Sequence, residues 1–184
     1  GQGGARSMFV SSNARPLRSI SIASDTAFAL PGPFRGLGRW RAGLFVADLG
    51  EAQRFPHSKL AAYKVSLTPA DRLELGAGLM STFGGRGGPP LTTWQRIVDL
   101  FPYIGWLREG SDRIASNKVA TADVRLRIPE WRGTTLYYEL AMDDFDLRRP
   151  RSMLIDDSGH LLGVSIARLR DDGTLSLDVR GHHT

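Results

Sequence analysis

Apolar and polar side chains alternate with a period of two residues through most of this 184-residue chain. Successive side chains of a β-strand point to opposite faces, so this period predicts strands with one apolar and one polar face. In segment 134–143 the apolar positions are Leu136, Tyr138, Leu140 and Met142. The pattern favours an all-β, antiparallel protein over any helical fold.

Eight segments carry the signal and are predicted to be strands. They are 19–30, 41–48, 60–68, 73–83, 118–128, 134–143, 161–169 and 174–180. Several are about ten residues long, whereas strands of soluble proteins are usually about five or six residues. A tilted strand that crosses a bilayer needs about 9–11 residues. Strand length therefore favours a transmembrane β-barrel segment of about eight strands, in a single domain spanning residues 1–184.

The connections between these strands support the same prediction. They are 31–40, 49–59, 69–72, 84–117, 129–133, 144–160 and 170–173. From residue 69 onward they alternate between short and long, as expected of outer-membrane barrels with short periplasmic turns and long external loops. In the longest, Trp94, Ile97, Val98 and Phe101 have helical spacing, which predicts a short helix within 93–109, lying in or over the barrel mouth.

The two faces of the strands would then meet lipid and water. We expect nine apolar side chains to point outward to lipid: Ala61, Tyr63, Val65, Leu67, Leu73, Leu75, Leu136, Tyr138 and Leu140. The opposite faces mix glycine and serine with charges of both signs, which a water-filled lumen tolerates. The alternative is a soluble β-domain, apolar inside, whose net charge of +5 attracts an acidic polymer or nucleic acid.

The candidate substrate-binding residues are the charged ones expected in the lumen or loops. They are Lys64, Glu74, Asp123, Arg125, Arg127, Glu139, Asp143 and Asp144. The cluster Arg148-Arg149-Pro150-Arg151 falls in an expected external loop and is either simply solvated or attracts an anionic polymer or lipid head group.

Catalytic, metal and cofactor sites are not expected. The chain has no cysteine, and its four histidines have no partners at metal-ligand spacing. The glycine-rich segment 84–88 precedes Pro-Pro and not a helix, unlike a phosphate loop. A barrel enzyme acting on lipids would need a Ser–His pair at strand height facing the membrane, and His57 and His160 fall in expected connections.

Three short motifs resemble a known family. They are Ser12-Asn13-Ala14-Arg15-Pro16, the stretch from Ser111-Asp112 through Asn117 to 122–129, and Tyr137-Tyr138-Glu139-Leu140 followed by Asp143-Asp144. Their order and spacing resemble Wzi-type capsule-assembly proteins over most of residues 7–180. The resemblance implies a bacterial outer-membrane β-barrel that attaches exported capsular polysaccharide to the cell surface, without catalysis.

The resemblance also sets expectations about partners and completeness. It implies polysaccharide and outer-membrane lipid as partners, and no nucleic acid. The chain supplies fewer strands than the family's full barrel, and no signal peptide is evident at its start. We therefore expect a segment of a longer chain, forming an open, curved sheet in which the strand near Ser19 does not pair with the strand near Thr174.

Overall fold

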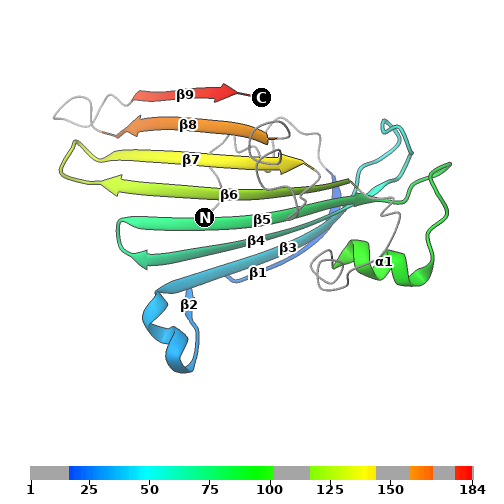
Figure 1. Ribbon diagram of the computed structural model, residues 1–184, viewed down its shortest axis with the longest axis horizontal. Helices are drawn as coiled ribbons and strands as arrows, with labels where there is room; N and C mark the ends of the chain where they lie inside the picture. Colours follow the sequence, from blue (N-terminus) through cyan, green and yellow to red (C-terminus); the bar gives the residue numbers. More distant parts are fainter. Residues whose placement is uncertain (1–16, 102–116, 144–157, 168–176, 184) are drawn as a thin grey trace.

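The computed structural model describes residues 17–101, 117–143, 158–167 and 177–183 of the chain (Figure 1). These residues form one antiparallel sheet in the order β1-β3-β4-β5-β6-β7-β8-β9, with the short β2 paired to β3. The strands are β1 (Arg18–Ala23), β2 (Phe28–Ala29), β3 (Arg39–Asp48), β4 (Lys59–Ala70), β5 (Leu73–Phe83), β6 (Asn117–Ile128), β7 (Thr134–Asp143), β8 (Ser158–Ile166) and β9 (Leu177–His183). The prediction of an all-β, antiparallel fold is confirmed.

Most strand positions agree with the alternation in the sequence. Strands β5 and β7 have the predicted bounds, and β3 and β6 start slightly earlier than expected. Strand β4 continues through Pro69, where a turn was expected, because a bulge between Leu67 and Ala70 interrupts its pairing with β5. A proline lacks the N–H that a regular ladder needs, and a bulge accommodates this loss.

The first predicted strand, 19–30, is wrong as a continuous element. The chain leaves the sheet after Ala23 and rejoins it as β2 at Phe28. At the break, the Ser24 N–H donates to the Ala42 carbonyl at 2.9 Å, and Ser24 Oγ accepts from the Ala42 N–H at 3.1 Å. A serine side chain that takes a ladder hydrogen bond offers the backbone an alternative to the sheet, and here it ends β1.

The sheet is open. Within the described residues β1 pairs only with β3, and β9 pairs only with β8, so the two outer strands do not meet. The expectation that the strand near Ser19 does not pair with the strand near Thr174 is therefore confirmed. Residues 49–58, 84–116 and 144–157 join strands at one end of the sheet, and 24–38, 71–72, 129–133 and 167–176 join them at the other (Figure 1). The two shortest connections, 71–72 and 129–133, both lie at the second end.

The strand register gathers the alternating side chains into an apolar face and a polar face. The apolar face contains all nine side chains predicted to meet lipid, together with apolar side chains of the flanking strands. These are Ile20, Ile22, Leu44, Val46, Ala61, Tyr63, Val65, Leu67, Leu73, Leu75, Ala77, Leu79, Ala120, Ala122, Val124, Leu126, Leu136, Tyr138, Leu140, Met142, Leu162, Val164 and Val179. Many of them are exposed, with Val124 at 41% and Leu162 at 62%.

The long-connection end of the apolar face is covered in part by helix α1 (Thr93–Leu100). Tyr63 donates a hydrogen bond to the Leu100 carbonyl and its ring lies 6.4 Å from that of Phe101. Lys118 of β6 lies 3.7 Å from Asp99, and both side chains are buried. The helix therefore rests on the apolar face at this end of the sheet. Because the described sheet is open, the expectation that the helix lies in or over a barrel mouth stays a prediction.

The helix itself begins as its sequence requires. Thr92 and Gln95 form a reciprocal capping box, in which each side chain accepts from the other's backbone N–H. Among the described residues, no helix has the length and hydrophobicity needed to cross a bilayer.

Gly38, which ends the 3₁₀ helix η1 (Gly32–Leu37), is predicted to tolerate no side chain. Its φ of 114° and ψ of −162° fall in a region that essentially only glycine occupies, and a Cβ there would collide with the backbone of Thr68 and Pro69. We expect Gly38→Ala to lower the free energy of unfolding by about 1–3 kcal/mol or more. Urea unfolding followed by tryptophan fluorescence measures this change.

Gly36→Ala is the matched control, because the same helix leaves open space around that Cβ position. Equal stability of the two variants would show that the tight approach of Gly38 to β4 is absent in solution.

Candidate functional site

On the polar face, charged side chains from strands that are not direct neighbours form an ion pair. Lys64 of β4 forms an ion pair with Asp123 of β6, although β5 lies between the two strands. The intervening position is Gly76, where a side chain would occupy the space of the Asp123 carboxylate. Both charged side chains are about one-fifth exposed. The glycine in β5 therefore permits the pair to form above the backbone.

A second charged group lies along the same face toward the short-turn end. Glu74 Oε2 of β5 accepts from Arg125 Nη1 at 3.4 Å and from Arg127 Nη2 at 3.3 Å, both on β6. The Glu74 side chain is 14% exposed and that of Arg127 is 55% exposed. One carboxylate thus offsets part of the charge of two guanidinium groups, and the outer one remains accessible to a ligand.

The remaining predicted site residues are placed less tightly. Glu139 of β7 lies opposite Asp123 in the β6–β7 register and is buried. Asp143 lies at the long-connection end of β7, opposite Val119. Asp144 and the cluster at 148–151 lie outside the described residues. The structure therefore brings five predicted residues together as two charged groups: Lys64, Glu74, Asp123, Arg125 and Arg127.

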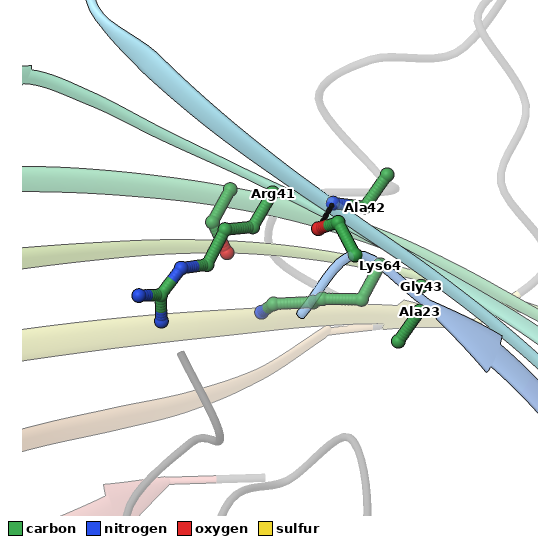
Figure 2. A pocket seen from close by; sticks show the side chains of 7 residues that line it. Ala23, Arg41, Ala42, Gly43 and Lys64 are labelled. Atoms are coloured by element: carbon green, nitrogen blue, oxygen red, sulfur yellow. Dashed lines mark hydrogen bonds between the residues drawn. The ribbon is translucent and has the colours of Figure 1, made fainter. Parts of the chain in front are cut away.

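A hollow of about 480 Å³ opens on the sheet where β1 ends. It is lined by Ala23, Ser24, Arg41, Ala42, Gly43, Lys64 and Ser66. Arg41 and Lys64 extend from neighbouring strands in the same direction along it (Figure 2). Arg41 was not among the predicted site residues, because the irregular alternation of segment 41–48 does not distinguish it from an ordinary surface arginine.

His160 is not in a connection, as the sequence suggested, but within β8 on the apolar face. Its Nε2 lies 3.0 Å from Ser158 Oγ, and its Nδ1 lies 2.7 Å from the Tyr138 hydroxyl. A serine hydrolase needs an acid beside the imidazole to stabilise the imidazolium that forms during reaction. Here Nδ1 faces the hydroxyl of Tyr138 instead of a carboxylate, so we interpret the group as a polar cluster near the start of β8.

The connections are organised by ion pairs near both ends of the sheet. Asp48 accepts from Lys59 Nζ at 2.8 Å and from the Gly50 N–H at 2.8 Å, which closes connection 49–58. At the opposite end Arg72 pairs with Glu130, and a backbone hydrogen bond within Glu130 together with Arg72 holds the pKa of that carboxyl below its ordinary value. The described residues contain no cluster of three potential metal ligands.

An antiparallel sheet with one exposed apolar face and one charged face is typical of the class of β-barrel membrane proteins. The sequence profile of the family described as capsule assembly protein Wzi matches residues 1–184, and the chain belongs to this family.

Two known proteins show how this chain relates to longer relatives. A Klebsiella pneumoniae protein, described as an uncharacterized 55.8 kDa protein in the cps region, is 25% identical over 112 residues, which are 60% of this chain and 21% of that protein. A solved Wzi structure, described as an outer membrane protein involved in group 1 capsule assembly in Escherichia coli and a carbohydrate binding β-barrel, has a TM-score of 0.65 and 18% identity. The match covers 94% of this chain and 34% of the solved one.

Proposed function

We propose that this chain is part of an outer-membrane β-barrel that binds capsular or extracellular polysaccharide, without catalysis, through the polar face of its sheet. The observation that carries the proposal is the separation of the two faces. Side chains such as Ile22, Val124 and Leu162 are exposed at 71%, 41% and 62%, while charges gather on the opposite face. A contiguous apolar surface of this kind favours lipid as its partner.

The soluble alternative accounts for these observations less well. A soluble β-domain would bury the apolar face against a second layer and expose the charged one. In the described residues only α1 lies against the apolar face, and it covers the long-connection end. Fractionation of the complete protein discriminates the two: a barrel remains with the membrane until detergent is added, whereas a soluble domain does not.

The polar face offers the chemistry that polysaccharide binding needs. Sugar hydroxyls both donate and accept hydrogen bonds, and a face with guanidinium, ammonium and carboxylate groups supplies both roles. Family membership and the description of the solved relative as carbohydrate binding support this function. We propose Lys64, Glu74, Asp123, Arg125, Arg127, Glu139, Asp143 and Asp144 as the residues from which the ligand contacts are drawn.

We expect Arg125→Gln/Arg127→Gln to weaken binding of the complete protein, in detergent, to the capsular polysaccharide of its own bacterium by about tenfold. A tenfold loss corresponds to about 1.4 kcal/mol, within reach of one or two charge-assisted hydrogen bonds. Surface plasmon resonance on immobilised polysaccharide measures the change.

Arg72→Gln is the matched control, since Arg72 lies in the turn 71–72 and pairs with Glu130 instead of facing the sheet. If both variants bound as the parent does, or lost binding equally, the polar face would not be the binding surface.

A further inference from the structure

The hollow beside β1 contains one cation, the guanidinium of Arg41, for which the described part of the chain provides no partner. Arg41 is exposed, and among the described residues it has no hydrogen-bond or ion-pair partner. Its neighbour Lys64 already pairs with Asp123. Among the described residues that line the hollow, Arg41 and Lys64 carry a charge, and the pairing of Lys64 with Asp123 offsets one of these two positive charges. Asp25 follows Ser24 in the chain but is not among the residues that line the hollow.

The shape of the hollow follows from the break between β1 and β2. Because the chain leaves the sheet after Ala23, the stretch of β3 around Arg41 and Ala42 lacks a regular neighbour on that side. Gly43 and Ala23 add little side-chain bulk at its floor, and a Cβ on Gly43 would still lie 3.5 Å from that of Ala23. Ser66, opposite Arg41 in the β3–β4 register, adds a hydroxyl-bearing side chain to the lining of the hollow.

These groups match a carboxylate better than a phosphate monoester. A guanidinium presents two parallel N–H donors at the spacing of the two oxygens of a carboxylate, and a neighbouring ammonium adds a further donor. One net positive charge balances a monoanion, whereas a phosphate monoester carries a charge of about −1.5 to −2 at neutral pH. A volume of about 480 Å³ is within the range of small-molecule sites.

We infer that the hollow formed by Arg41, Lys64 and Ser66 is a subsite for the carboxylate of an acidic sugar unit. This inference rests on the proposed polysaccharide function. It specifies the charge of the sugar unit that is bound and the residues that bind it. Arg41 would hold the carboxylate through its two N–H donors. Lys64 would contribute a third donor while it remains paired with Asp123.

The test uses the complete protein in detergent, with sodium glucuronate and a hyaluronan octasaccharide as acidic probes. Carboxyl-reduced hyaluronan octasaccharide is the neutral probe, and inorganic phosphate is the competing anion. We expect glucuronate to bind with a Kd in the millimolar range and the octasaccharide to bind at least fivefold more tightly than its reduced form. The binding of glucuronate and the preference for the acidic octasaccharide should both weaken at 0.5 M salt. Isothermal titration calorimetry measures the binding of all four probes: glucuronate, the octasaccharide, its reduced form and phosphate.

Arg41→Gln is expected to abolish the preference for the acidic octasaccharide while leaving binding of the reduced form unchanged. Arg41→Lys should retain part of it, because the charge remains but the two-pronged geometry is lost. Arg35→Gln, which removes an exposed arginine of η1 outside the hollow, should have no effect. Because Arg41 is exposed and has no described partner, these variants are expected to fold.

Three outcomes would overturn the inference: no saturable glucuronate binding, an unchanged preference in Arg41→Gln, or displacement of the octasaccharide by phosphate at lower concentration than by glucuronate. Failure of the proposed function gives a different result. In that case the parent protein would bind neither its own capsular polysaccharide nor any of the probe sugars, whatever their charge.

Discussion

Val124→Arg is expected to destabilise the inserted protein by about 2–4 kcal/mol if the apolar face meets lipid and this position lies near the bilayer midplane, because a guanidinium would then lie in hydrocarbon. Val124 lies within β6, between Leu75 of β5 and Tyr138 of β7, and its side chain is 41% exposed on the apolar face. Hydrocarbon would surround an arginine at this position. Urea-dependent unfolding of the complete protein from lipid vesicles measures the difference.

The control for this prediction is the next residue of the same strand, which points to the polar face. Arg125→Ala removes one of two arginines that donate to Glu74, and Arg127 remains as the partner of that carboxylate. Its effect on insertion should therefore be much smaller. Equal effects of the two substitutions on folding into vesicles would refute the assignment of the apolar face to lipid.

The 184-residue chain expressed alone is expected to form no heat-resistant monomeric barrel in detergent. Strands β1 and β9 each pair on one side only within the described residues, so each leaves a row of unpaired N–H and C=O groups. Such edges are too costly to leave in lipid, and in water they promote pairing between molecules. We expect aggregation or an open sheet, with identical mobility of heated and unheated samples on gels containing sodium dodecyl sulfate.

The complete protein, treated in the same way, should show the mobility difference between heated and unheated samples that a closed barrel gives. If the 184-residue chain instead ran as a compact monomer before heating and shifted its mobility after heating, β1 and β9 would join in detergent. That result would show that a small closed barrel forms where the structure has an open sheet.

The face of each side chain was predictable from the sequence, whereas the pairs that those side chains form were not. Alternation placed Lys64 and Asp123 on polar faces, but residues 59 positions apart meet only once the register of β4, β5 and β6 is set. A slip of one residue would move every side chain to the opposite face. Gly76 supplies the space between them, and its role is visible only when its neighbours are known.

Other features depended on individual side-chain contacts that the period-two pattern does not predict. Ser24 continues the alternation of β1, yet its side chain takes the Ala42 N–H and ends the strand, which creates the hollow at Arg41. The helical spacing of Trp94 and Ile97 predicted α1, but its position on the apolar face depends on Tyr63 and on the buried pair of Asp99 with Lys118. These contacts join residues distant in sequence.

The sequence by itself determined the all-β class, the approximate positions of most strands, the two faces and the alternation of short and long connections between residues 71 and 157. Each of these depends on the period-two pattern and on turn residues, which act over a few neighbouring positions. The tertiary structure alone decided the side on which α1 lies, the placement of His160 in β8 and the position of Arg41 without a partner among the described residues. These features depend on register and on cross-strand neighbours, and a one-dimensional pattern contains neither.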